Sequence, residues 1–162
     1  APGNWVFRVV DTVLKAVDVH PGAQVVERQF GMFEVHSDNQ SEVLRAGEVV
    51  LESLGLPLEA RIAPTIASEQ IITNVHPLQA QVLNRMNMGT MLEGGHTLLV
   101  LEVEPAAYIT LAANEAEKAS PIFLNHMSSV GIYGRMWISG TEADIEAARE
   151  AAITAIQSVT GQ

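Results

Sequence analysis

The chain has 162 residues, of which 48% are hydrophobic and only 5% aromatic, and its formal net charge is −10. A surface of that charge repels nucleic acid and anionic lipid, so neither is expected as a partner. The chain contains no cysteine, which excludes disulfides, thiolate catalysis and cysteine metal sites. No apolar run is long enough for a membrane span and no signal peptide is recognised, so the expected compartment is the cytoplasm.

The first part of the chain predicts a helix, two strands and a second helix. Apolar residues at helical spacing predict the first helix over residues 6–19. Its inward stripe consists of Val6, Val9, Val10, Val13, Leu14 and Val17. Pro21-Gly22 is expected to end that helix, before strands over 24–29 and 31–36. Residues 37–39 offer capping oxygens to a helix that runs to Ser53 and ends at Gly55, and residues 57–68 are the expected connector.

The second part is longer and predicts four strands and three helices. The expected elements are a strand over 70–75, a helix from His76-Pro77 to about Met88, a buried strand over 97–103, a helix over 108–119, strands over 122–129 and 133–139, and a helix over 142–158. The last helix is amphipathic, and its inward residues are Ile145, Ala148, Ala152, Ile153 and Ile156.

The chain also repeats itself at a constant offset of 103 residues (118 − 15). Residues 2–37 align without a gap on residues 105–140, so that Lys15 meets Lys118 and Gly31 meets Gly134. A constant long offset indicates two copies of one structural unit. We therefore predict two domains, over 1–60 and 61–162. The second copy has a strand, a helix and a strand before Pro105, so symmetry predicts that roughly forty residues of the first copy are absent from this chain.

Several short motifs resemble bacterial microcompartment (BMC) shell domains. The matching stretches include VERQFG at 26–31, LEV at 101–103 followed by Pro105-Ala106, and AANEAEKA at 112–119. The resemblance covers nearly the whole chain and points to the tandem-domain trimers of carboxysome shells. It implies an α/β (α+β) fold of two tandem, circularly permuted BMC domains. Each has a small, mostly antiparallel sheet flanked by helices, and three chains form a pseudohexamer.

The resemblance also implies a function. The chain is expected to be a structural tile of a carboxysome shell in the bacterial cytoplasm, with a large gated central pore and no enzymatic activity or cofactor. Its expected partners are further copies of itself, in a homotrimer or a stack of two trimers, and other BMC shell hexamers. The pore is expected to pass phosphorylated metabolites, namely ribulose bisphosphate and phosphoglycerate.

The family's tile-edge element falls on Asp11 with Lys15 and on Asn114 with Lys118. The i,i+4 spacing places both polar groups on one helix face, and a lysine stem can lie along a neighbour while its ammonium reaches an acceptor. Spacing alone favours an ordinary pair on a solvated helix face. The recurrence in both copies and the resemblance favour an edge contact between tiles.

The family's pore motif falls on Glu27 and Arg28, which are expected to surround the three-fold axis. Alternating carboxylates and guanidinium groups can pair around such an axis and close it. Val130 and Gly131 occupy the same positions in the second copy, so only alternate positions would carry charge. Residue types alone favour a surface ion pair at a strand end, and the match to the family motif favours the gate.

Two other functions remain open from the residues. One is a small-molecule binding or sensing module built from tandem α/β repeats, and the other is an acidic enzyme with a site at a trimer interface. The second needs converging titratable groups, which the sequence does not offer. The five histidines have no metal-ligand spacing, so no metal site is expected. The segment from Asn84 to Met88 suggests either a Met-rich contact surface or a core-facing helix end; we expect the core-facing end.

Overall fold

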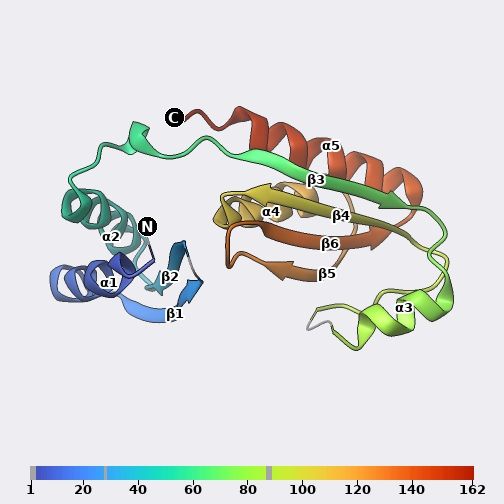
Figure 1. Ribbon diagram of the computed structural model, residues 1–162, viewed down its shortest axis with the longest axis horizontal. Helices are drawn as coiled ribbons and strands as arrows, with labels where there is room; N and C mark the ends of the chain where they lie inside the picture. Colours follow the sequence, from blue (N-terminus) through green and yellow to red (C-terminus); the bar gives the residue numbers. More distant parts are fainter. Residues whose placement is uncertain (1–2, 28, 87–88) are drawn as a thin grey trace. The chain divides into compact units, whose positions relative to one another are not determined.

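The computed structural model describes residues 3–27, 29–86 and 89–162 (Figure 1). The chain divides into two compact units. The first contains the residues up to Ile62 together with 130–132 and 161–162, and the second contains 63–129 and 133–160.

The first unit is a two-stranded hairpin with two helices. Its elements are α1 (Trp5–Ala16), β1 (His20–Glu27), β2 (Phe30–His36), α2 (Gln40–Leu54) and the short 3-10 helix η1 (Leu58–Ala60). β1 and β2 pair antiparallel. The buried core comprises Val9, Val13, Val19, Ala46 and Val49, so α1 and α2 pack together through small apolar side chains.

The expected caps of α2 are confirmed. The Asn39 side chain accepts a hydrogen bond from the Ser41 backbone N–H at 3.0 Å, as an N-cap should. Gly55 closes the helix in the left-handed conformation with φ 65°. Three other expectations in this unit were wrong. Helix α1 ends at Ala16 and not at residue 19, because Val17 is already extended. β1 already begins at His20, with a register irregularity between Pro21 and Gln24 that admits the Pro-Gly pair. Leu14, which was predicted to face inward, is exposed. The buried residues of α1 are Val6, Val9, Val10 and Val13.

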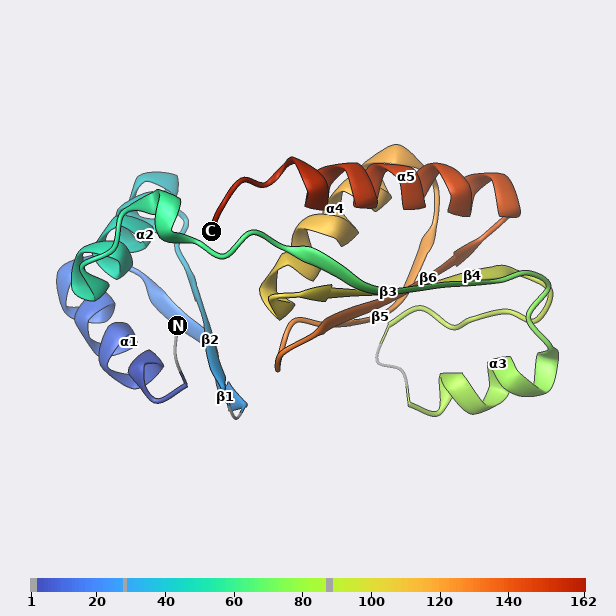
Figure 2. The same cartoon turned by 45° about the horizontal axis from the view of Figure 1, so that its top comes forward.

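The second unit contains a four-stranded antiparallel sheet in the order β3-β4-β6-β5. Its elements are β3 (Thr65–Ile72), α3 (Pro77–Asn84), β4 (Thr97–Glu104), η2 (Ala106–Tyr108), α4 (Ile109–Ala119), β5 (Phe123–Ser128), β6 (Gly134–Gly140) and α5 (Glu142–Ser158). α4 and α5 cover one face of this sheet, and α3 lies on the opposite face (Figure 2).

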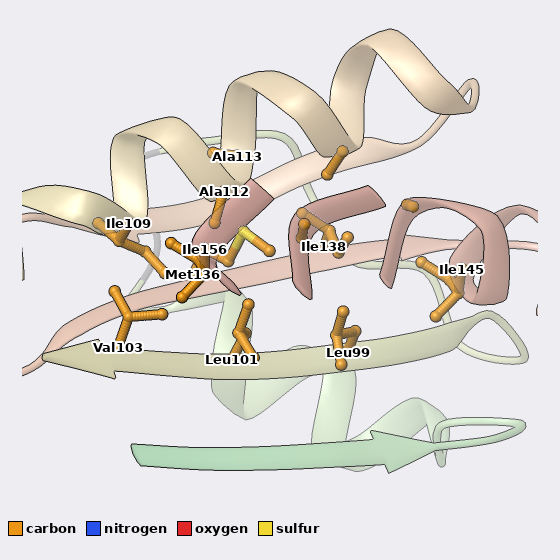
Figure 3. Packing of buried hydrophobic residues seen from close by; sticks show 13 residues of the cluster. Leu99, Leu101, Val103, Ile109, Ala112, Ala113, Met136, Ile138, Ile145 and Ile156 are labelled. Carbon is orange, nitrogen blue, oxygen red and sulfur yellow. The ribbon is translucent and has the colours of Figure 1, made fainter. Parts of the chain in front are cut away.

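Side-chain alternation along β4 builds a core on each face of the sheet. Leu99, Leu101 and Val103 are buried against α4 and α5, together with residues of β6 (Figure 3). Leu98, one position out of phase, is buried on the other face with Ala80 of α3. Successive strand residues point to opposite faces, so a continuous apolar run is what a strand covered on both sides requires.

Two elements in this unit, β3 and α3, differ from the sequence prediction by more than one residue. β3 lies earlier than expected, over Thr65–Ile72, and its partner β4 sets that register. α3 ends at Asn84 because both the donor and the acceptor of the Asn84 side chain are bonded to the Leu92 backbone, each at 2.8 Å. The expected end at Met88 lies outside the described residues. α5 has the expected bounds, and Ile153 is the one predicted inward residue that is only half-buried.

The two copies found in the sequence have the same strand register. Val25 pairs with Met32 and Gln24 with Phe33 in the first unit, and the pairs 103 residues later, Ser128 with Arg135 and Met127 with Met136, occur in the second. The register irregularity follows Pro21 in β1 and Leu124 in β5, again 103 residues apart. The repeat is therefore a repeat of strand pairing as well as of sequence.

Candidate functional site

Helix α1 carries the expected polar pair on its exposed side. The Lys15 Nζ lies 2.7 Å from the Asp11 Oδ2, and the two side chains are 74% and 61% exposed. An exposed i,i+4 pair contributes little to folding stability. Both charged groups therefore lie at the surface, accessible to a neighbouring molecule.

Helix α4 also carries its two expected polar residues, Asn114 and Lys118, on its exposed side. The Lys118 Nζ bonds to the Glu115 Oε1 at 2.8 Å, and the Asn114 amide donates to the same oxygen at 2.8 Å. Lys118 and Asn114 thus share one carboxylate instead of bonding to each other. The hydrogen bond from Lys118 lowers the pKa of Glu115. The i,i+3 spacing of Glu115 and Lys118 was the signal that could have revealed this pair.

Three of the four expected pore residues, Glu27, Val130 and Gly131, lie at or next to the turns of equivalent hairpins. Glu27 is the last residue of β1, is exposed, and stands opposite Phe30. Arg28 lies outside the described residues. Val130 and Gly131 are half-buried in the connection between β5 and β6. Gly131 has φ 98°, a conformation that favours glycine, so a backbone requirement accounts for this residue type.

Two ion pairs that the sequence analysis missed join elements of the second unit. Arg149 of α5 bonds to Glu69 of β3, and Arg135 of β6 bonds to Glu102 of β4. The hydrogen bond that Arg149 donates to Glu69 raises the pKa of Arg149. The partners are far apart in the chain, so no local spacing could have predicted them.

The histidines of the second unit make local contacts. His76 caps α3, its Nδ1 accepting from the Leu78 backbone N–H at 3.2 Å, and His126 packs on Trp137 with ring centroids 4.8 Å apart. The described residues contain no group of three or more His, Cys, Asp or Glu side chains that could hold a metal ion. Within the same residues, no helix is long and apolar enough to span a membrane.

One strand pair and its two helices recur at a constant offset along the chain. Such a repeated α/β unit with antiparallel strands is the architecture of a tandem-domain shell protein. Two solved structures share it over nearly the whole chain. One is the fused permuted hexameric shell protein MSM0275 from the RMM microcompartment, 40% identical with a TM-score of 0.89 over 96% of this chain and 79% of that one. The other is the double ringed trimeric shell protein MSM0271 from the same microcompartment, 37% identical with a TM-score of 0.94 over 100% and 80%.

The sequence comparisons identify the family. The family described as the CsoS1D N-terminal domain matches residues 1–60. The carboxysome shell protein CcmP of Synechococcus elongatus is 48% identical over the whole chain and 76% of its own length. The carboxysome shell protein CsoS1D of Hydrogenovibrio crunogenus is 40% identical over 99% of this chain and 78% of its own length, and CsoS1D of Prochlorococcus marinus is 40% identical over 99% and 63%.

This chain belongs to the CcmP/CsoS1D family of carboxysome shell proteins, with the permuted tandem BMC fold. The resemblance inferred from the motifs is confirmed. As a member of this family the chain is a structural component of the carboxysome shell and not an enzyme.

Proposed function

We propose that three copies of this chain form a pseudohexameric shell tile with a gated central pore. The duplicated strand register is the observation that supports it most directly, because three chains with two equivalent units each supply six similar wedges around one axis. The names of the two similar structures, a permuted hexameric and a double ringed trimeric shell protein, agree with that assembly. The two wedges would be the domains over 1–60 and 61–162.

The proposed gate consists of Glu27, the last residue of β1, and of Arg28, which follows it in the sequence. The equivalent position between β5 and β6 carries Val130 and Gly131, so a ring would alternate charged and uncharged positions. Three copies carry three times the formal charge of −10, a field that disfavours anions. Arg28 would offset that charge locally and could contact phosphate groups. We therefore propose phosphorylated metabolites, such as ribulose bisphosphate and phosphoglycerate, as the molecules that pass.

We also propose that tiles join through Asp11 and Lys15 on one edge and Asn114 and Lys118 on the equivalent edge, with copies of this chain or with other shell hexamers. Two trimers are proposed to stack into a double ring, as the name of MSM0271 describes for that protein. A stack would place two gates in series around a chamber.

The test is electron cryomicroscopy of the protein with and without ribulose bisphosphate. We expect three-fold particles in both open and closed classes, and we expect the double variant Glu27→Ala/Arg28→Ala to give only open pores. A matched control is Arg45→Ala/Glu48→Ala, which removes an exposed ion pair of 2.9 Å from α2 and should leave the pore classes unchanged. Closed pores in the gate variant would refute the gate, and monomeric particles would refute the tile.

A further inference from the structure

Two histidines lie directly opposite each other at the open end of the β1–β2 hairpin. His20 is the first residue of β1, His36 is the last residue of β2, and the two are paired across the strands. Their ring centroids are 6.0 Å apart, with an angle of 43° between the ring planes. A separation of 16 residues (36 − 20) is no metal-ligand spacing in the sequence, and only the strand register brings the two rings together.

Both imidazoles are exposed on the side of the hairpin that faces away from the helices. Phe33 and Val35 of β2 pack on the core that α1 and α2 form. Successive strand residues point to opposite faces, so His36, and His20 opposite to it, point away from that core. Both rings are therefore accessible to an ion from solution.

The spacing of the two rings suits one transition-metal ion held by both. Directly opposed strand residues have Cβ atoms about 4.5–5.5 Å apart. A Zn–N bond is about 2.0–2.1 Å long, so two imidazoles on one ion have ring centroids roughly 5–6 Å apart. The observed 6.0 Å lies at the upper end of that range, so small side-chain rotations bring a nitrogen of each ring onto the ion. Imidazole is a suitable ligand for zinc, copper and nickel ions.

The charges of the hairpin favour a cation. The strands β1 and β2 carry the carboxylates of Glu27 and Glu34 and no Lys or Arg. Glu34 lies on the same face as His36, and a Cβ on Gly22 would stand 3.1 Å from the Glu34 carboxyl carbon. The part of the chain that the structure describes has no group of three or more His, Cys, Asp or Glu that could hold a metal ion. Glu34 therefore contributes charge, and water completes the coordination.

We propose that His20 and His36 form a two-ligand site for a divalent transition-metal ion such as Zn²⁺. The second unit does not repeat this site, because the positions 103 residues later are Phe123 and Ser139, which are also paired across the strands. An ion that needs both imidazoles binds only when β1 and β2 are paired in this register, so it stabilises the hairpin by mass action. The site does not depend on Glu27, at the other end of β1, acting in a pore gate.

The first experiment titrates the full chain and the variant His36→Ser with ZnCl₂ by calorimetry, at slightly alkaline pH where free imidazole is neutral. Serine occupies the equivalent position in the second unit, so the strand should accept it. Loss of an outer partner of a metal ligand weakens binding by about 10–100-fold, and loss of one of two ligands should weaken it at least as much.

The matched control is His76→Asn, because His76 is also exposed and asparagine keeps its capping role. This variant should keep the wild-type affinity for Zn²⁺. The site is wrong if His36→Ser binds Zn²⁺ as tightly as the wild type, if the wild type binds no Zn²⁺, or if the control weakens equally.

A second experiment counts the nitrogen ligands. Electron paramagnetic resonance of bound Cu²⁺ should show two imidazole nitrogens in the wild type and no more than one in His20→Ala. Sedimentation of the same samples should show the same particle mass with and without Cu²⁺. A single nitrogen in the wild type would overturn the paired site, and a rise in mass would show that the ion joins separate copies instead.

Discussion

Gly31 and Gly134 occupy the same place in the two copies, each with a helix start lying directly against it. A Cβ on Gly31 would stand 2.6 Å from the Gly3 carbonyl oxygen and 2.8 Å from the Val6 Cβ. A Cβ on Gly134 would meet the Ala106 carbonyl oxygen and, at 2.8 Å, the Ile109 Cβ. Gly3 and Val6 precede Ala106 and Ile109 by 103 residues, so both copies depend on the same close approach of backbone to strand.

Substitution of either glycine by alanine is therefore expected to destabilise the protein. The obstructing atoms include backbone, which cannot move aside, and overpacking of this kind costs about 1–3 kcal/mol. Gly134→Ala should lower the free energy of unfolding, measured by urea denaturation, by an amount in that range. Gly47→Ala is the control, because a Cβ there meets nothing within 4 Å. In a helix interior it should stabilise by about 0.5–1 kcal/mol. Equal effects of the two substitutions would contradict the argument.

The proposed tile edge predicts an assembly defect without a folding defect. Lys15 and Lys118 are exposed and their pairs are worth little to folding. The variant Lys15→Ala/Lys118→Ala should keep the wild-type free energy of unfolding within about 0.5 kcal/mol. It should form fewer two-dimensional sheets in electron micrographs. The substitution Arg45→Ala, also on an exposed helix face, should leave sheet formation unchanged. If the lysine variant forms two-dimensional sheets of normal extent, Lys15 and Lys118 do not form the tile edge.

The Arg149–Glu69 pair should couple α5 to β3 more strongly than a surface pair does. Both side chains are less than one third exposed, at 29% and 27%. A double-mutant cycle with Arg149→Met and Glu69→Gln should give a coupling of about 1.5–3 kcal/mol, in the range of hydrogen bonds to charged groups. The same cycle on Arg45 and Glu48, which are 48% and 64% exposed, should give about 0.2–1 kcal/mol. A smaller coupling energy for Arg149–Glu69 than for Arg45–Glu48 would show that burial does not strengthen the Arg149–Glu69 pair.

The Glu115 carboxyl should titrate below its ordinary pKa of 4.5, because Lys118 donates to its ionised form. A depressed folded pKa stabilises the protein above the unfolded pKa, and the contribution is lost as the pH falls through the folded value. Carbon-detected NMR titration of Glu115 measures this directly, and Lys118→Met should raise the pKa toward 4.5. An unchanged titration in Lys118→Met would show that another group lowers it.

Local patterns predicted most of the elements. Asn39 and Gly55 marked the ends of α2 because caps depend on neighbouring residues alone, and the bounds of α5 followed from its periodicity and its cap. The position of β3 and the end of α3 were missed, since β3 takes its register from β4 and α3 is ended by a bond from Asn84 to Leu92. The β3–β4 pairing joins residues that no short window contains, and the Asn84–Leu92 bond depends on how the loop between them folds.

The sequence by itself determined the duplication and the family, because a repeat at constant offset and short motifs are properties of residue order. Only the tertiary structure decided that Arg149 bonds to Glu69, that Gly134 is needed against Ala106, and that Leu78, Val82 and Met86 face outward. Each of these depends on which surfaces meet once sheet and helices have packed. A helix that is apolar on two sides does not reveal, from its residues alone, which side the core takes.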